Sequence, residues 1–187
     1  EYEVVRLPDD VTKEEFDPQK GVVDGSATCL NCNAPMDADR FKEKIAADNF
    51  SYELLGVKYE KAGESQGSYR SPTTDDEAAM DAAVDRIKSD VDLATFLTTE
   101  IPEGQETDRL FNWGFTEWRD IYSPRQLVTH YEYLQAFKEC RGAIKNEHNE
   151  ETTEAILTLL CLVTSKSLDR NSILSPWSTR KGYPENA

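Results

Sequence analysis

Cys29 and Cys32 have the spacing in this chain that is most typical of metal chemistry. A reverse turn can aim both thiolates at one Zn²⁺, and the small and Asn residues around them allow a tight backbone. A structural zinc site takes four ligands, so this pair supplies half of one. Cys140 and Cys161 fall in predicted helices without a partner pair, so other ligands would come from upstream residues or a symmetry mate. The pair predicts a zinc half-site, with ordinary reduced thiols as the alternative.

Catalytic side chains form no recognisable constellation in this sequence. Neither His130 nor His148 has a Cys or Ser partner at a familiar spacing, and we expect both to serve at the surface or in helix packing. There is no Gly-rich phosphate loop and no nucleophile elbow. We therefore expect no catalytic residue in this chain.

A second group of chemically capable residues mixes aromatic rings with arginines: Trp113, Phe115, Trp118, Arg119, Tyr122 and Arg125. Rings that stack on bases and guanidinium groups that contact phosphate are typical of single-stranded nucleic-acid binding. The alternative is an aromatic cluster that packs a linker against the following helix.

The charge of the chain limits its partners. It has 187 residues, with 21 Lys and Arg against 36 Asp and Glu, a net charge of −15 and a pI of about 4.5. A surface this acidic repels nucleic acid, so any DNA contact must be local or be made by another part of the protein. Acidic residues are scattered along the whole chain, which fits a halophilic source and predicts unfolding in low salt with recovery in molar salt.

Apolar residues make up 38% of the chain, enough for a globular core. The longest nearly apolar run is Ala155–Val163, far short of the roughly 20 residues of a membrane helix. The first residues lack a signal peptide, and cysteines are too few for a disulfide scaffold, so we expect a cytoplasmic protein without a membrane partner. Residue 1 is Glu and not a start Met, and we expect the chain to be part of a longer protein.

The elements that must position the cysteines are short. We expect strands over residues 1–7 and 22–28, the second of which runs into the cysteine turn. Asp37 predicts the start of a helix to about residue 48, and the Gly-containing loop 61–68 predicts a hairpin over residues 52–71.

Longer helices follow in the second half of the chain. Thr74 and Glu77 form a predicted capping box for a helix to about Asp90, and residues 92–109 lack periodicity and read as a linker. Ser123 and Pro124 begin a helix toward Gly142. The next helix starts at Thr152 or Thr153 and ends near Leu168, and its apolar circumference must be buried against the preceding helix or a missing domain.

These elements predict an α+β fold, with a small β-rich part that resembles half a zinc ribbon, followed by a mainly helical part. We divide the chain into a β-rich part with the cysteine turn (1–72), a helix and linker (73–109) and a helical part (110–187).

The run from Trp113 to Leu127, WGFTEWRDIYSPRQL, resembles the Zn-ribbon-containing adenine-specific DNA methylase family. Members carry a run of the form Gly-hydrophobic-Thr-x-Trp-x-Asp-hydrophobic-aromatic-Ser/Thr-Pro-Arg-Gln-Leu before a helix. Order and spacing also agree at the upstream Cys-x-x-Cys, at Tyr69-Arg70, and at Asp169-Arg170-Asn171-Ser172 with Trp177. The resemblance covers about residues 20–180. One departure is Asn33, which follows Cys32 where such ribbons usually have Gly.

The resemblance implies an enzyme that transfers a methyl group from S-adenosylmethionine to N6 of adenine, with a Rossmann-like catalytic domain. The cofactor motif and the Asp-Pro-Pro-Tyr motif of the family precede and follow this region, and residues 1–187 hold neither. The chain would then be a non-catalytic middle region that aids DNA target recognition or domain assembly, and the first cysteine pair of the ribbon would lie upstream. Its partners would be the missing catalytic domain and, through the intact protein, DNA.

We expect three arginines, Arg119, Arg125 and Arg170, to contact phosphate or bases. The alternative is a structural or protein-interaction module that docks through the apolar helix and never touches DNA.

Overall fold

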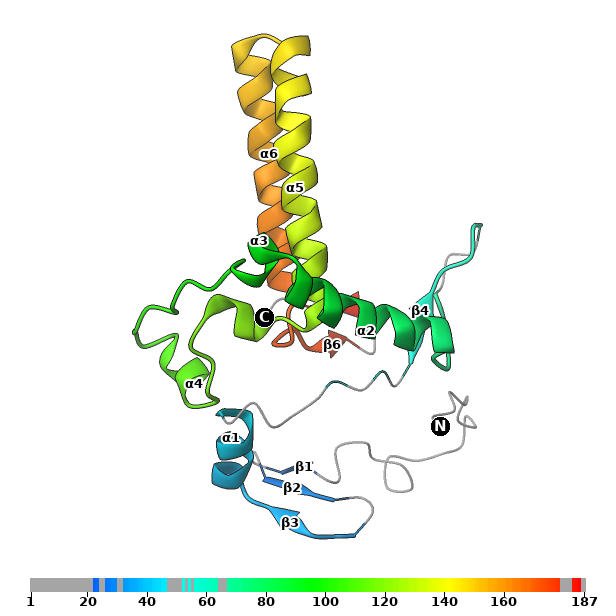
Figure 1. Ribbon diagram of the computed structural model, residues 1–187, viewed down its shortest axis with the longest axis vertical. Coiled ribbons are helices and arrows are strands. Elements are labelled where there is room, and N and C mark those ends of the chain that lie inside the picture. The colour runs from blue at the N-terminus through cyan, green and yellow to red at the C-terminus, as the bar shows by residue number, and fades with distance from the viewer. Residues whose placement is uncertain are drawn as a thin grey trace. The chain divides into compact units, whose positions relative to one another are not determined.

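The computed structural model divides into two compact units, each described by itself: residues 1–72 with 101–116 (unit 1), and residues 73–100 with 117–187 (unit 2). Figure 1 shows their elements. The structure describes residues 22–23, 26–29, 32–46, 52, 54, 56–63, 67–178 and 183–185. The strand predicted over residues 1–7 lies outside these residues.

The cysteine region of unit 1 is a three-stranded antiparallel sheet in the order β1-β2-β3. Its strands are β1 (Val22–Val23), β2 (Ser26–Thr28) and β3 (Pro35–Met36). Helix α1 (Ala38–Ala46) follows at once, and the Arg40 N–H donates to the Asp37 carboxylate at 2.8 Å. The predicted helix start at Asp37 is therefore confirmed.

The rest of unit 1 contains a hairpin and one short helix. Strand β4 (Val57–Tyr59) pairs antiparallel with β5 (Ser68–Arg70), which confirms the predicted hairpin. Helix α4 (Asp108–Phe111) lies in the second segment of the unit, where Phe115 is buried. Gly114, at φ 81°, provides the left-handed turn between them.

In unit 2, helix α2 (Thr74–Ser89) begins one residue earlier than its predicted cap implies. The Asp76 N–H donates to the Thr73 hydroxyl at 3.4 Å, and the Thr73 N–H donates to the Asp76 carboxylate at 2.9 Å. The capping box is thus Thr73 with Asp76, where the sequence indicated Thr74 with Glu77. Two adjacent threonines before an acidic run allow either register, and Thr73 has the extended backbone of a cap.

The predicted linker over residues 92–109 instead supplies the centre of the unit 2 core. Helix α3 (Val91–Ala94) places Leu93 fully out of solvent against Leu127 and Tyr131. The 3-10 helix η1 (Trp118–Ile121) follows along the chain. A helix of four residues is too short to show periodicity, which is why the sequence did not indicate it.

The longest elements form an antiparallel helical hairpin, α5 (Pro124–Glu147) and α6 (Glu150–Arg170), which lie side by side in Figure 1. The predicted start of α5 at Ser123 and Pro124 is confirmed, but the helix continues past Gly142. Helix α6 begins at Glu150, two or three residues before the predicted start at Thr152 or Thr153, because Asn149 caps it. Strands β6 (Trp177–Ser178) and β7 (Tyr183–Pro184) close the described chain.

The architecture is mixed, with helices dominant in unit 2 and small antiparallel sheets, and this agrees with the predicted α+β class. Among the described residues, none of the helices has the length and apolar character that crossing a bilayer requires.

Candidate functional site

The described residues of the cysteine turn are joined by two backbone hydrogen bonds. The Asn33 N–H donates to the Cys29 carbonyl at 2.8 Å, and the Cys29 N–H donates to the Ala34 carbonyl at 3.0 Å. Asn33 has a left-handed backbone, at φ 56°. Asn adopts this conformation more readily than other side-chain-bearing residues, so Asn33 fills the position where Gly is usual.

Both cysteines of the turn are exposed and neither forms a disulfide. Within the described ranges, no group of three or more His, Cys, Asp or Glu side chains could hold a metal ion. Cys29 and Cys32 therefore belong to no group of three or more such side chains in this part of the chain, and the zinc half-site remains a prediction. The geometry that supports it is the left-handed turn, which the sequence presented only as a departure from the usual Gly.

Arg119, the first of the three arginines predicted to contact DNA, has a structural contact. Its guanidinium donates to the Ala94 carbonyl, at the end of α3, and its backbone N–H donates to the Leu97 carbonyl at 2.9 Å. A cation at a helix C-terminus offsets the negative end of the helix dipole. Arg119 thus fixes α3, and with it Leu93, to the segment that precedes α5.

Arg125 and Arg170 are exposed and lie at the same end of the helical hairpin. Arg125 is in the first turn of α5 and Arg170 is the last residue of α6. Their neighbours join the two ends, since the Gln126 side-chain amide donates to the Asn171 side-chain oxygen at 3.4 Å. Two of the three predicted arginines are thus brought together, although 45 residues separate them in sequence.

His130 is a buried part of this same helix end, with 4% of its surface exposed. Its Nε2 lies 3.1 Å from the Asn171 carbonyl, and the Tyr122 ring packs edge-on at a centroid distance of 5.0 Å. Burial lowers the pKa of His130, against the smaller raising effect of the Asn171 carbonyl. A neutral imidazole that donates to a carbonyl serves helix packing, as the sequence indicated.

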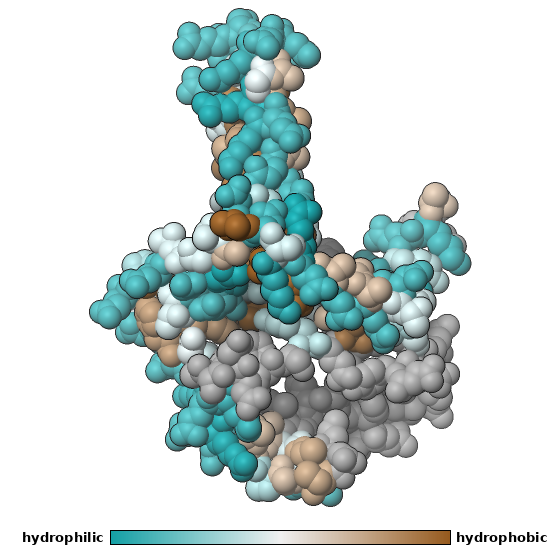
Figure 2. Space-filling view, viewed as in Figure 1, coloured by the Kyte–Doolittle hydropathy of each residue, from teal (hydrophilic) through white to brown (hydrophobic). Residues whose placement is uncertain are grey.

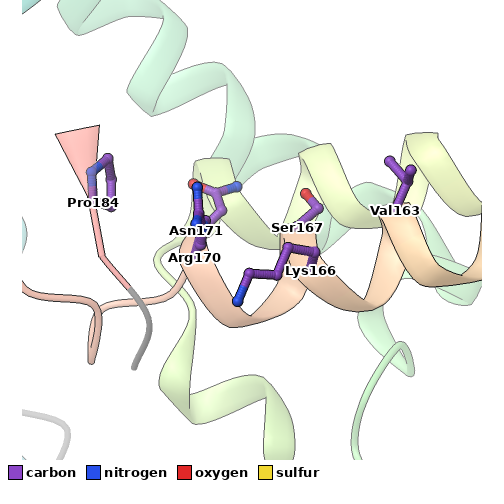
Figure 3. Close-up of a pocket in the computed structure, with 6 residues that line it drawn as sticks. All are labelled: Val163, Lys166, Ser167, Arg170, Asn171 and Pro184. Atoms are coloured by element: carbon purple, nitrogen blue, oxygen red, sulfur yellow. The ribbon is translucent and has the colours of Figure 1, made fainter.

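A pocket of about 560 Å³ lies along the last turns of α6, opposite Pro184 of β7 (Figure 3). Its lining residues are Val163, Lys166, Ser167, Arg170, Asn171 and Pro184. The Lys166 ammonium pairs with the Asp169 carboxylate at 2.6 Å. This neighbouring carboxylate and the negative end of the α6 dipole both weaken attraction for an anion, so the pocket is a poor phosphate site despite its two cations.

The predicted aromatic cluster is divided between the two units. In unit 1, Trp113 packs edge-on against Phe41 at 5.8 Å, and the Lys42 ammonium lies 5.4 Å from its ring centre. In unit 2, Tyr122 packs against His130. Tyr122 thus packs on the helix that follows it, as the alternative interpretation expects, whereas Trp113 packs on α1.

Comparison with protein-family models, curated proteins and solved structures gave no match for this chain.

Proposed function

We propose that this chain is a non-catalytic region of an S-adenosylmethionine-dependent DNA adenine-N6 methyltransferase, in which it serves domain assembly. The proposal is supported by the resemblance of the Trp113–Leu127 run and by what its residues do. Ser123 and Gln126 cap α5 reciprocally, Leu127 is in the core, and Arg119 anchors α3. These residues hold the start of the α5–α6 hairpin in place, and none of these roles requires a catalytic group.

The observation that carries the proposal is the outward face of α6. Leu159, Leu162 and Val163 are 64%, 61% and 57% exposed, although α5 already packs along the helix. Figure 2 shows hydrophobic residues along the sides of this otherwise hydrophilic hairpin. Burying a Leu or Val side chain contributes about 1.5–3 kcal/mol, so a contiguous exposed group favours a second packing partner.

In this proposal the cysteine turn is the second half of a zinc ribbon. Cys29 and Cys32 would hold Zn²⁺ with two ligands from the other half, and the metal would stabilise the fold without taking part in methyl transfer. Both thiols would need the reducing conditions of the cytoplasm to stay available. S-adenosylmethionine would bind the catalytic domain, not this chain.

The second candidate is DNA target recognition, which the shared position of Arg125 and Arg170 favours. An adenine must leave the base stack to be methylated, and cations beside the catalytic domain could hold the opened duplex. The net charge of −15 and the carboxylate beside Lys166 oppose this role. We therefore place assembly first.

Titration of the chain with duplex DNA at several salt concentrations separates the two roles. The assembly role predicts no salt-sensitive binding, and the same result for Arg125→Ala/Arg170→Ala. Binding that weakens with salt in the wild type and is lost in that variant would establish target recognition instead. Arg119→Ala is unsuitable for this comparison because it removes a structural contact.

A further inference from the structure

Four exposed residues of α6 have the spacing of a coiled-coil seam. Ala155, Leu159, Leu162 and Lys166 recur at intervals of four, three and four residues, and we call them the outer stripe. Val163 flanks the stripe and is also exposed. This alternation keeps apolar residues on one side of a helix and is typical of seams between two helices.

The outer stripe lies on the opposite side of α6 from its contact with α5. In the first half of the helix the less exposed residues are Thr153, Ile156, Leu157 and Leu160, which also recur at helical spacing and mark the inner side. Ala155 follows Thr153 by two residues, a rotation of roughly 200° at 3.6 residues per turn. Helix α6 therefore has two apolar sides, of which α5 covers one.

Charge is distributed unequally along the outer side of α6. Glu151 lies in the first turn on this side, whereas Lys166 ends the stripe, where its ammonium pairs with the Asp169 carboxylate of the same helix at 2.6 Å. A helix that packs antiparallel on this stripe must therefore carry acidic residues at its own N-terminal end and a cation toward its C-terminal end. Helix α6 of a second copy meets both requirements.

We propose that the outer stripe binds the same stripe of a second copy of this chain, in antiparallel orientation. A two-fold axis between residues 160 and 161 sets Leu159 of each copy opposite Leu162 of the other, and Ala155 opposite Lys166. Glu151 of each copy then lies opposite Arg170 of the other and one helical turn from its Lys166, which would exchange its pairing with Asp169 for an intermolecular one. The contact is isologous and closes at two copies, because each stripe is occupied by the other.

This proposal rests on the assembly role proposed above, since it names the partner of the same face. Its test is the mass of the whole 187-residue chain, measured by sedimentation equilibrium over a range of concentrations and salt. We expect a concentration-dependent dimer in the wild type and a monomer for Leu159→Ser/Leu162→Ser. Circular dichroism of the variant establishes that it is folded.

The matched control is Val91→Ser/Leu174→Ser, which removes two exposed apolar side chains of unit 2 outside the stripe. We expect this control to dimerise as the wild type does. A wild type that stays monomeric at every concentration, or a dimer that survives Leu159→Ser/Leu162→Ser, overturns the proposal.

Charge reversal tests the antiparallel orientation. Lys166→Glu should weaken the dimer by placing like charges together, and adding Glu151→Lys/Glu154→Lys should restore it. Restoration is specific to antiparallel pairing, because parallel helices would leave position 166 opposite position 166. Failure to restore the dimer overturns the orientation.

The two proposals can fail separately. If the wild-type chain is monomeric but the leucine variant still lowers methylation by the intact enzyme, the stripe docks another domain and only the second-copy proposal fails. If the leucine variant changes neither mass nor methylation, both fail.

Discussion

The two units differ in how their elements are held. In the first segment of unit 1, none of residues 26–29, 32–44, 52, 54, 56–63 and 67–72 is buried, and strands of two or three residues are joined by turn hydrogen bonds, whereas its second segment buries Ile101 and Phe115. Unit 2 has a core around Leu93, Leu127 and Tyr131, together with two helices of 24 and 21 residues. Local contacts thus define the first region and long-range packing defines the second.

This difference indicates what each region requires from elsewhere. Small sheets with few buried residues usually depend on a metal or another staple, and the proposed zinc ribbon would supply one. Unit 2 has its own core but exposes an apolar helix side. In the proposed assembly, other parts of the protein would supply metal ligands to the first region and a packing surface to the second.

The largest expected effect is at the centre of the unit 2 core. Leu93→Ala should lower the free energy of unfolding by about 2–5 kcal/mol, because Leu93 is fully buried and the smaller side chain leaves a cavity inside the core. Val91→Ala, two residues away and 77% exposed, is the control and should change it by less than about 0.5 kcal/mol. Urea denaturation of both variants measures the difference, and equal values would mean that α3 is not a core element.

Arg119 tests whether an arginine predicted to contact DNA is structural. Arg119→Ala should cost about 1–3 kcal/mol of unfolding free energy, since it leaves the Ala94 carbonyl without its charged donor. Arg125→Ala, at an exposed position, should cost less than about 0.5 kcal/mol. Thermal unfolding monitored by circular dichroism compares them. If Arg119→Ala has wild-type stability, the structural role is contradicted and Arg119 is again a candidate for contact with DNA.

Asn33 tests the local character of unit 1. Asn33→Ala should destabilise the cysteine turn by about 1–2 kcal/mol because Ala disfavours a left-handed backbone, and Asn33→Gly should preserve the turn. Amide hydrogen exchange at Cys29 and residue 33 reports the turn, while the denaturation midpoint of unit 2 should stay constant. A shift of that midpoint in Asn33→Ala would show that the regions are not independent.

The smallest expected effect is a pH dependence from His130. Its pKa is lowered in the folded chain, so the unfolded chain takes up the proton first as pH falls below about 6.5. The free energy of unfolding should fall through this window and level off below the lowered pKa. His130→Gln should reduce the slope. Identical slopes in wild type and His130→Gln would contradict the assignment.

The sequence predicts elements that carry their own start signals. Asp37 and Ser123 with Pro124 mark helix starts that the structure confirms, because capping is a local interaction. The sequence placed the start of α2 one residue late and missed α3. Leu93 is buried through residues more than 30 positions away, and no local pattern encodes such a contact.

The candidate site shows the same contrast between local features, which the sequence indicates, and long-range contacts, which it does not. The spacing of Cys29 and Cys32 predicts a turn, and the structure adds the left-handed Asn33 that makes it tight. Arg119 was predicted from its aromatic neighbours, whereas its contact is with a carbonyl 25 residues away. The sequence alone does not indicate which side of α6 packs against α5 and which side is exposed, because apolar residues occur all around the helix.

Adenine methylation by the intact protein tests the central claim most directly. N6-methyladenine formed in DNA would be measured for the wild type, for Leu159→Ser/Leu162→Ser, and for the control Val91→Ser/Leu174→Ser. The account predicts methylation by the wild type and the control, and loss of most of it in the leucine variant. Equal methylation by all three proteins would contradict the assembly role, and a wild type that forms no N6-methyladenine would contradict the methyltransferase assignment.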